Sequence, residues 1–199
     1  METVVNVPRF GGTLCFEFAN TLEPRTSTTP TDLLREREDV IRFGIRSGLP
    51  VSLPGDRRPD RAAAEAEELA RARALREAVY AVFVAVVERR PPEPEAIESL
   101  QSAYVNAMAR SELAAGPHGW EWRSTAGGVD AVLDAVARDA VDLLRSPRSA
   151  RVKRCGDAED GCGWLFVDAT KSGTRRWCSM QICGSRAKAS RQRARQKHA

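Results

Sequence analysis

The sequence predicts a mainly α protein with a short β element: a helical N-terminal domain followed by a small C-terminal module held together by four cysteines. Three observations lead to this prediction. Apolar residues recur at steps of three and four in three segments between residues 61 and 143, as in helices with one buried face. Four of the five cysteines lie in the last quarter of the 199-residue chain. The charge balance changes sign near residue 147, so we expect domains at residues 1–147 and 148–199.

Two short strands are expected in the N-terminal domain. Over residues 11–18, apolar side chains alternate with Cys15 and Glu17, and a period of two indicates a strand with one buried face. In residues 120–124, two tryptophans alternate with polar residues in the same way. We expect the second strand either to be isolated or to pair with the first.

Helices account for most of the remaining N-terminal domain. After a loop rich in Thr, Ser and Pro, the first helix is capped by Thr31 or Asp32 and stopped by Gly44 or Gly48. Pro147 stops the last one. The apolar stripes of three longer helices lie within residues 61–90, 95–110 and 129–143.

Four cysteines in the C-terminal module predict a metal site. They form two pairs separated by fifteen residues, which suits the four thiolate ligands of a tetrahedral zinc ion. The gaps within the pairs are wider than in an ordinary zinc knuckle, and disulfides or unligated thiols are the alternatives. The first residues lack the features of a secretory signal, so we expect a reducing, cytoplasmic location, which favours zinc. We therefore predict one structural zinc ion bound by Cys155, Cys162, Cys178 and Cys183.

Charge is unevenly distributed along the chain. Residues 1–147 hold 18 Lys and Arg against 23 Asp and Glu, a net charge of −5, whereas residues 148–199 hold 13 against 4, a net charge of +9. A basic module of this kind is typical of proteins that bind phosphate backbones, although a solvated basic tail is the simpler alternative. The candidate nucleic-acid contacts are Lys171, Arg175, Arg176, Arg186, Lys188, Arg191, Arg193, Arg195 and Lys197.

The cysteine module also resembles a known family. The segments Cys162-Gly-Trp-Leu-Phe-Val-Asp168, Arg175-Arg-Trp-Cys-Ser-Met180 and Cys183-Gly-Ser-Arg186 resemble the CGNR-type zinc finger. Upstream, Gly12-Thr-Leu-Cys-Phe-Glu-Phe-Ala-Asn-Thr-Leu22 is similar to the opening of the ABATE domain that accompanies this finger in bacterial proteins. This resemblance implies a bacterial transcription regulator linked to stress responses, whose finger binds zinc and DNA. Two departures are a wide first cysteine pair and Ser185, which replaces the Asn of the family's name.

The combined interpretation is a zinc-finger DNA-binding transcription regulator that responds to a small ligand or a stress signal. Double-stranded DNA is the expected partner, and the N-terminal domain is expected to sense an effector or to form a homodimer. Glu17, Asn20, Arg25 and the adjacent Thr26 are a candidate ligand pocket, although Asn20 is also suited to turning the backbone. Cys15 is expected to be a core residue.

The sequence also bears on other classes of function, some of which it allows and some of which it makes unexpected. An RNA-associated or ribosome-associated zinc protein would carry a similar basic tail, and a protein-interaction adaptor would use zinc only for shape. An enzyme is not expected, because neither His118 nor His198 has a neighbour suited to orient it and no Gly-rich phosphate loop is present. The longest apolar run, residues 78–87, has ten residues, so no membrane span is expected where about twenty are needed.

Overall fold

The computed structural model describes residues 4, 6, 8–53, 61–117, 119–156 and 161–197, apart from the side chains of Ala194 and Lys197. His118 and His198 therefore lie outside the described residues. The helices are α1 (Leu14–Ala19), α2 (Arg37–Arg46), α3 (Ala62–Glu88), α4 (Pro94–Ala109), α5 (Gly128–Arg145), the 3₁₀ turn η2 (Pro147–Arg151), the π-helical turn η3 (Met180–Gly184) and α6 (Ser185–Lys197). Among these described residues, three two-stranded antiparallel sheets join β1 (Leu22–Glu23) to β2 (Thr31–Asp32), β3 (Ser111–Gly116) to β4 (Gly119–Ser124), and β5 (Val152–Arg154) to β6 (Leu165–Val167).

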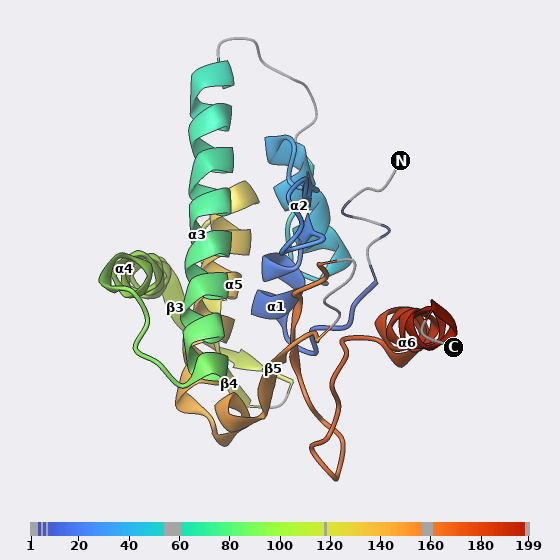
Figure 1. Ribbon diagram of the computed structural model, residues 1–199. Coiled ribbons are helices and arrows are strands. Elements are labelled where there is room, and N and C mark those ends of the chain that lie inside the picture. The colour runs from blue at the N-terminus through green and yellow to red at the C-terminus, as the bar shows by residue number, and fades with distance from the viewer. Residues whose placement is uncertain are drawn as a thin grey trace.

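The long helix α3 forms the centre of the molecule. It packs against α4 on one side and against α1 and α2 on the other, with α5 behind it (Figure 1). Edge-to-face aromatic pairs tie these helices together, with ring centroids 4.8 Å apart for Phe16 and Phe83 and 5.1 Å apart for Phe18 and Phe43. The expected mainly α fold is confirmed, and no described helix combines the length and apolar character that a bilayer crossing requires.

The strand predicted over residues 11–18 is wrong, because most of this segment forms α1. The amide of Cys15 donates to the Asp139 carboxylate in α5 at 2.7 Å, and the Thr13 hydroxyl donates to the same oxygen. Asp139 thus caps the helix from 124 residues away in the chain. Helix α1 is buried from Cys15 to its end, Glu17 included, so the alternation of residue types does not correspond to one buried and one exposed face.

The predicted start of the first expected helix, which is α2 in the structure, and the predicted strand pairing are also wrong. Thr31 and Asp32 form β2 instead of capping a helix, and α2 begins after Glu36, whose amide donates to the Asp39 carboxylate at 3.2 Å. A strand does form at β4, but it pairs with β3, which immediately precedes it, since a tight turn makes this neighbour the nearest partner.

The three long helical segments are confirmed by α3, α4 and α5, and α5 ends at Arg145, just before Pro147. Gly48 follows the end of α2 with a φ of +78°, as expected for a glycine that stops a helix. The buried face of α4 contains Leu100 and Ala107, whereas Ile97 is 37% exposed. The buried face of α4 is therefore rotated away from Ile97 and toward Ala107. The small side chain of Ala107 allows close approach to the neighbouring helices.

The C-terminal module packs directly on the helical domain. The Asn20 side chain, which is fully buried, donates to the Leu165 carbonyl at 2.9 Å and accepts from the Leu165 amide at 3.0 Å. The Arg25 amide donates to the Cys162 carbonyl at 2.8 Å, and the Tyr80 hydroxyl donates to the Gly163 carbonyl at 3.0 Å. Strand β6 thus belongs to the same core as α1 and α3.

Replacement of Asn20 by Ala is expected to destabilise the zinc-loaded protein by about 2–4 kcal/mol, because two buried backbone groups of Leu165 would lose their partners. Urea unfolding of parent and variant measures the difference. Asn106→Ala, at an exposed position of α4, is the matched control and should change stability by less than about 0.5 kcal/mol. Equal, small effects of the two substitutions would show that this contact does not hold the module in place.

Candidate metal centre and nucleic-acid interface

The four cysteines predicted to bind zinc lie together beside α6. Their Sγ atoms are all within 4.8 Å of one another, and Cys178 Sγ is 3.6 Å from the Sγ atoms of both Cys162 and Cys183. A tetrahedral zinc ion with Zn–S bonds of about 2.3 Å needs sulfur atoms about 3.8 Å apart. All four cysteines are buried, and no disulfide joins them. The donor set and its spacing fit one zinc ion, and four thiolates make that ion structural.

Electrostatics in this cluster favour a bound cation. Hydrogen bonds from neighbouring cysteines lower the pKa of Cys155, whereas hydrogen bonding with Cys155 raises the pKa of Cys178. The physical cause is that one thiolate accepts hydrogen bonds from its neighbours and opposes a second negative charge beside it. A divalent ion removes this opposition and allows all four sulfur atoms to ionise.

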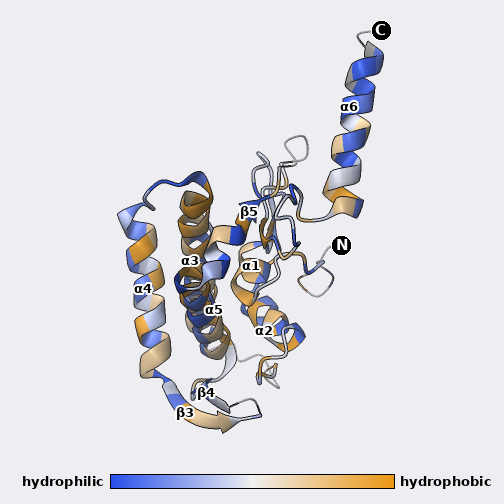
Figure 2. Cartoon of the chain, turned by 90° about the horizontal axis from the view of Figure 1, so that it is seen from below, coloured by the Kyte–Doolittle hydropathy of each residue, from blue (hydrophilic) through white to orange (hydrophobic). Residues whose placement is uncertain are grey.

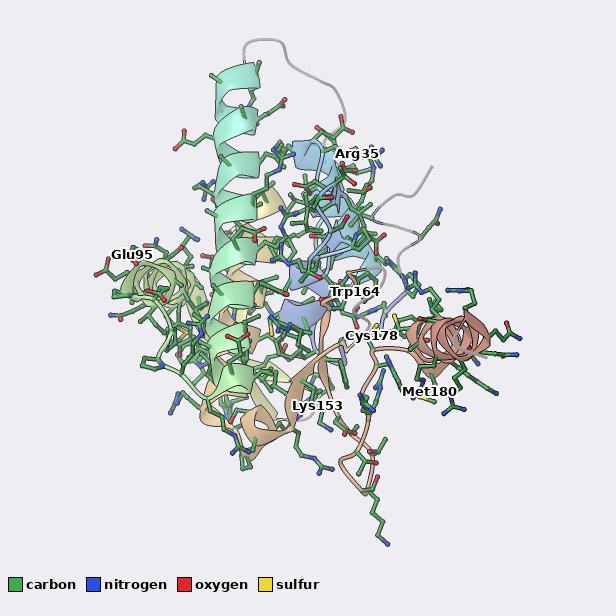
Figure 3. The ribbon with its side chains drawn as sticks, in the orientation of Figure 1. Arg35, Glu95, Lys153, Trp164, Cys178 and Met180 are labelled. Atoms are coloured by element: carbon green, nitrogen blue, oxygen red, sulfur yellow. The ribbon has the colours of Figure 1, made fainter. Side chains whose placement is uncertain are left out.

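Several groups around the sulfur atoms support the site. The Cys178 amide donates to Cys155 Sγ at 3.4 Å, and the Arg186 guanidinium donates to Cys183 Sγ at 3.5 Å. Trp164 is 5% exposed and lines the same hollow as Cys178 of the cluster (both labelled in Figure 3). A hollow of about 280 Å³ lies next to the cluster, between the N-terminal segment, the β1–β2 hairpin and the finger.

The turn that carries Lys171 is organised by an ion pair whose carboxylate is buried. Lys153 Nζ donates to Asp168 at 2.8 Å and also to the carbonyls of Gly173 and Arg175. Burial raises the pKa of Asp168, but hydrogen bonds from Lys153 and Thr170 outweigh it and hold the pKa well below its usual range. Charge and spacing in the sequence did not identify this pair, although Asp168 belongs to the segment that resembles the CGNR finger.

The predicted nucleic-acid contacts separate into two groups. Arg175 is directed into the finger, where it donates to the carbonyls of Trp177 and Cys178 and lies 4.6 Å from the Phe166 ring centroid. Its guanidinium is therefore committed to the fold of the finger. The exposed residues are Lys171 and Arg176 in the turn and Arg186, Lys188, Arg191, Arg193 and Arg195 on α6.

Helix α6 projects from the rest of the molecule. It follows η3 directly and makes its main contacts with that turn, so the hydrophilic helix stands away from the helical domain (Figure 2). Ser185, at the start of α6, donates to the Met180 carbonyl at 3.4 Å. The side chain of Lys197 lies outside the described residues, and the structure does not place it.

The structure does not bring the candidate ligand-pocket residues together around one cavity. Glu17 accepts hydrogen bonds from the Gly11 and Gly12 amides, at 3.0 and 3.3 Å, and burial raises its pKa despite these bonds. Asn20 binds the backbone of β6, and Arg25 lies over the Tyr80 ring and bonds Glu77 at 3.0 Å. All three connect parts of the fold, a role that the sequence did not suggest, since it indicated only a local turn at Asn20.

These features define a four-cysteine zinc-finger protein with an attached helical domain. Comparison with family models agrees with the geometry. Residues 12–147 match ABATE, described as "Putative stress-induced transcription regulator", and residues 151–196 match the CGNR zinc finger. The chain belongs to the ABATE family and carries a C-terminal CGNR zinc finger. No curated protein matches it in sequence.

We expect one zinc ion per chain in protein purified under reducing conditions, measured by elemental analysis. Cys178→Ser and Cys183→Ser should each abolish stoichiometric zinc, because each removes one of four clustered thiolates. Cys15→Ser is the control and should keep the metal, since this buried thiol lies against Asp139, away from the cluster, and burial raises its pKa. Zinc-free parent protein, or full zinc in the two variants, would contradict the assignment.

Proposed function

We propose that this protein is a DNA-binding transcription regulator in which the zinc finger presents α6 to the phosphate backbone of duplex DNA. The observation that carries the proposal is a helix whose described, exposed side chains are polar or charged apart from Ala189, five of them cationic, and which has no apolar stripe to bury. A helix without an apolar stripe gains little from docking on a protein surface. Cations around it instead gain from releasing the counterions that surround DNA.

The attachment of α6 supports this role. Its first turn contacts the zinc centre through Arg186 and Cys183, and η3 continues into the helix without a linker. The metal site therefore fixes the position from which the helix extends. Lys171 and Arg176 lie on the turn of the same module and extend the basic surface. The acidic helical domain lies on the other side of the finger, which favours contact through α6 and this turn.

The proposal also includes an effector site and a cellular compartment. A small effector would bind in the hollow beside the zinc centre in preference to the Glu17, Asn20 and Arg25 group, because its wall includes Arg186 of α6. Thiolate ligands suit a reducing compartment such as the cytoplasm. We propose that the protein acts by binding and not by catalysis.

Competition experiments distinguish the alternative functions. Preference for structured RNA over duplex DNA would indicate the RNA-associated alternative, and salt-insensitive protein binding would indicate an adaptor.

Replacement of Arg191, Arg193 and Arg195 by Ala should weaken binding to duplex DNA and reduce the slope of log K against log salt by about 2.7, since each phosphate contact contributes about 0.9. Fluorescence anisotropy over a range of salt concentrations measures both quantities. A control with the same change of charge, Arg61, Arg71 and Arg90 to Ala on the helical domain, should keep the slope. If both triple variants retained it, α6 would not be the contact surface.

A further inference from the structure

The β3–β4 hairpin carries an exposed apolar face that the proposed function does not use. Trp120 is 73% exposed, Trp122 is 49% exposed and Leu113 is 53% exposed. Trp122 lies opposite Leu113, and Trp120 lies opposite Ala115 in the antiparallel register. Residues that face each other in this register lie on the same side of the sheet. The two tryptophans therefore share one surface, and monomeric soluble proteins seldom leave such a surface uncovered.

The described residues of the hairpin are tied to the rest of the molecule only near its base. The Ser124 hydroxyl donates to Asp134 at 2.8 Å, and the Thr125 amide donates to the Arg110 carbonyl at 2.8 Å. Beyond these contacts, the described residues of β4 from Gly119 to Arg123 are exposed. The sheet has two strands only, so the described part of the chain provides no third strand for the outer edge of β4. Unpaired edges of this kind are templates for another strand.

Charges on the opposite face of β4 indicate which strand fits that edge. Glu121 and Arg123 form an ion pair at 3.0 Å within the strand, and both side chains are about half exposed. In an antiparallel pairing of β4 with a second β4, the register that sets Trp122 against its own copy also sets Glu121 against Arg123 of the second copy, twice by symmetry. A shift by two residues either way would set Glu121 against Glu121, or Arg123 against Arg123, and like charges in opposing positions are destabilising.

We propose that β4 is a dimerisation strand that pairs antiparallel with β4 of a second copy of this chain, with a two-fold axis through Trp122. The pairing extends the sheet from two strands to four and sets the Trp122 side chains of the two copies against each other on one face. Helix α6 lies at the end of the molecule opposite the hairpin (Figure 2), so the dimer leaves both basic helices accessible. This inference does not depend on nucleic-acid binding.

Sedimentation equilibrium of the zinc-loaded full chain, without nucleic acid, tests the proposal. The parent should approach twice its 21.9 kDa mass as its concentration rises through the micromolar range. Trp122→Ser should raise the dissociation constant at least about tenfold by removing the central apolar contact. Glu121→Arg should weaken association about tenfold, and the double variant Glu121→Arg, Arg123→Glu should return it to within about threefold of the parent.

If Trp122→Ser folds poorly, the variants of Glu121 and Arg123 still test the proposal. These variants alter only exposed side chains. Val105→Ser, at a 56% exposed position of α4, is the control and should leave association unchanged. A parent that stays monomeric would overturn the proposal, as would a dimer unaffected by Trp122→Ser and Glu121→Arg. Failure of the double variant to restore association would also overturn it, because the two-fold register requires restoration.

Discussion

The C-terminal module depends on one cation that neutralises four closely spaced thiolates. Their sulfur atoms lie within 4.8 Å of one another, a separation at which negative charges repel strongly unless a metal neutralises them. A module of about 45 residues buries too little apolar surface to fold by that means alone, so metal binding supplies folding free energy. The ligand Cys183 lies in η3, directly before α6. The same bonds that close the module therefore set the origin of its basic helix.

The module and the helical domain stabilise each other. Phe166 and Leu165 of β6 are fully buried in a core shared with α1 and α3, and Asn20 supplies hydrogen bonds that a third β strand would otherwise give. A hydrogen-bonded, apolar contact of this kind resists independent motion of the two parts. The helical domain thus acts as a rigid support for the finger.

The sequence correctly predicted the features that depend on residues close together in the chain. Each apolar stripe of α3 and α5 can be recognised within a single segment of the chain. The same is true of the spacing of the four cysteines. Sequence reasoning missed α1, whose cap is Asp139 of α5, and the pairing of β4 with β3, because period two does not identify a partner. It also placed Arg175 on the surface, since charge alone does not show that a guanidinium bonds backbone carbonyls. Each error involves contacts between residues that the local pattern does not encode.

Hydrogen exchange with and without bound zinc tests the central claim most directly. Removal of the metal by a chelator should increase exchange at the amides of Cys155, Leu165 and Gly184, which bond within or beside the zinc module. Amides in the middle of α3, around Val82, should stay protected because the helical domain keeps its own core. Unchanged exchange at Leu165 and Gly184 after complete loss of zinc would contradict a metal-held module that positions α6.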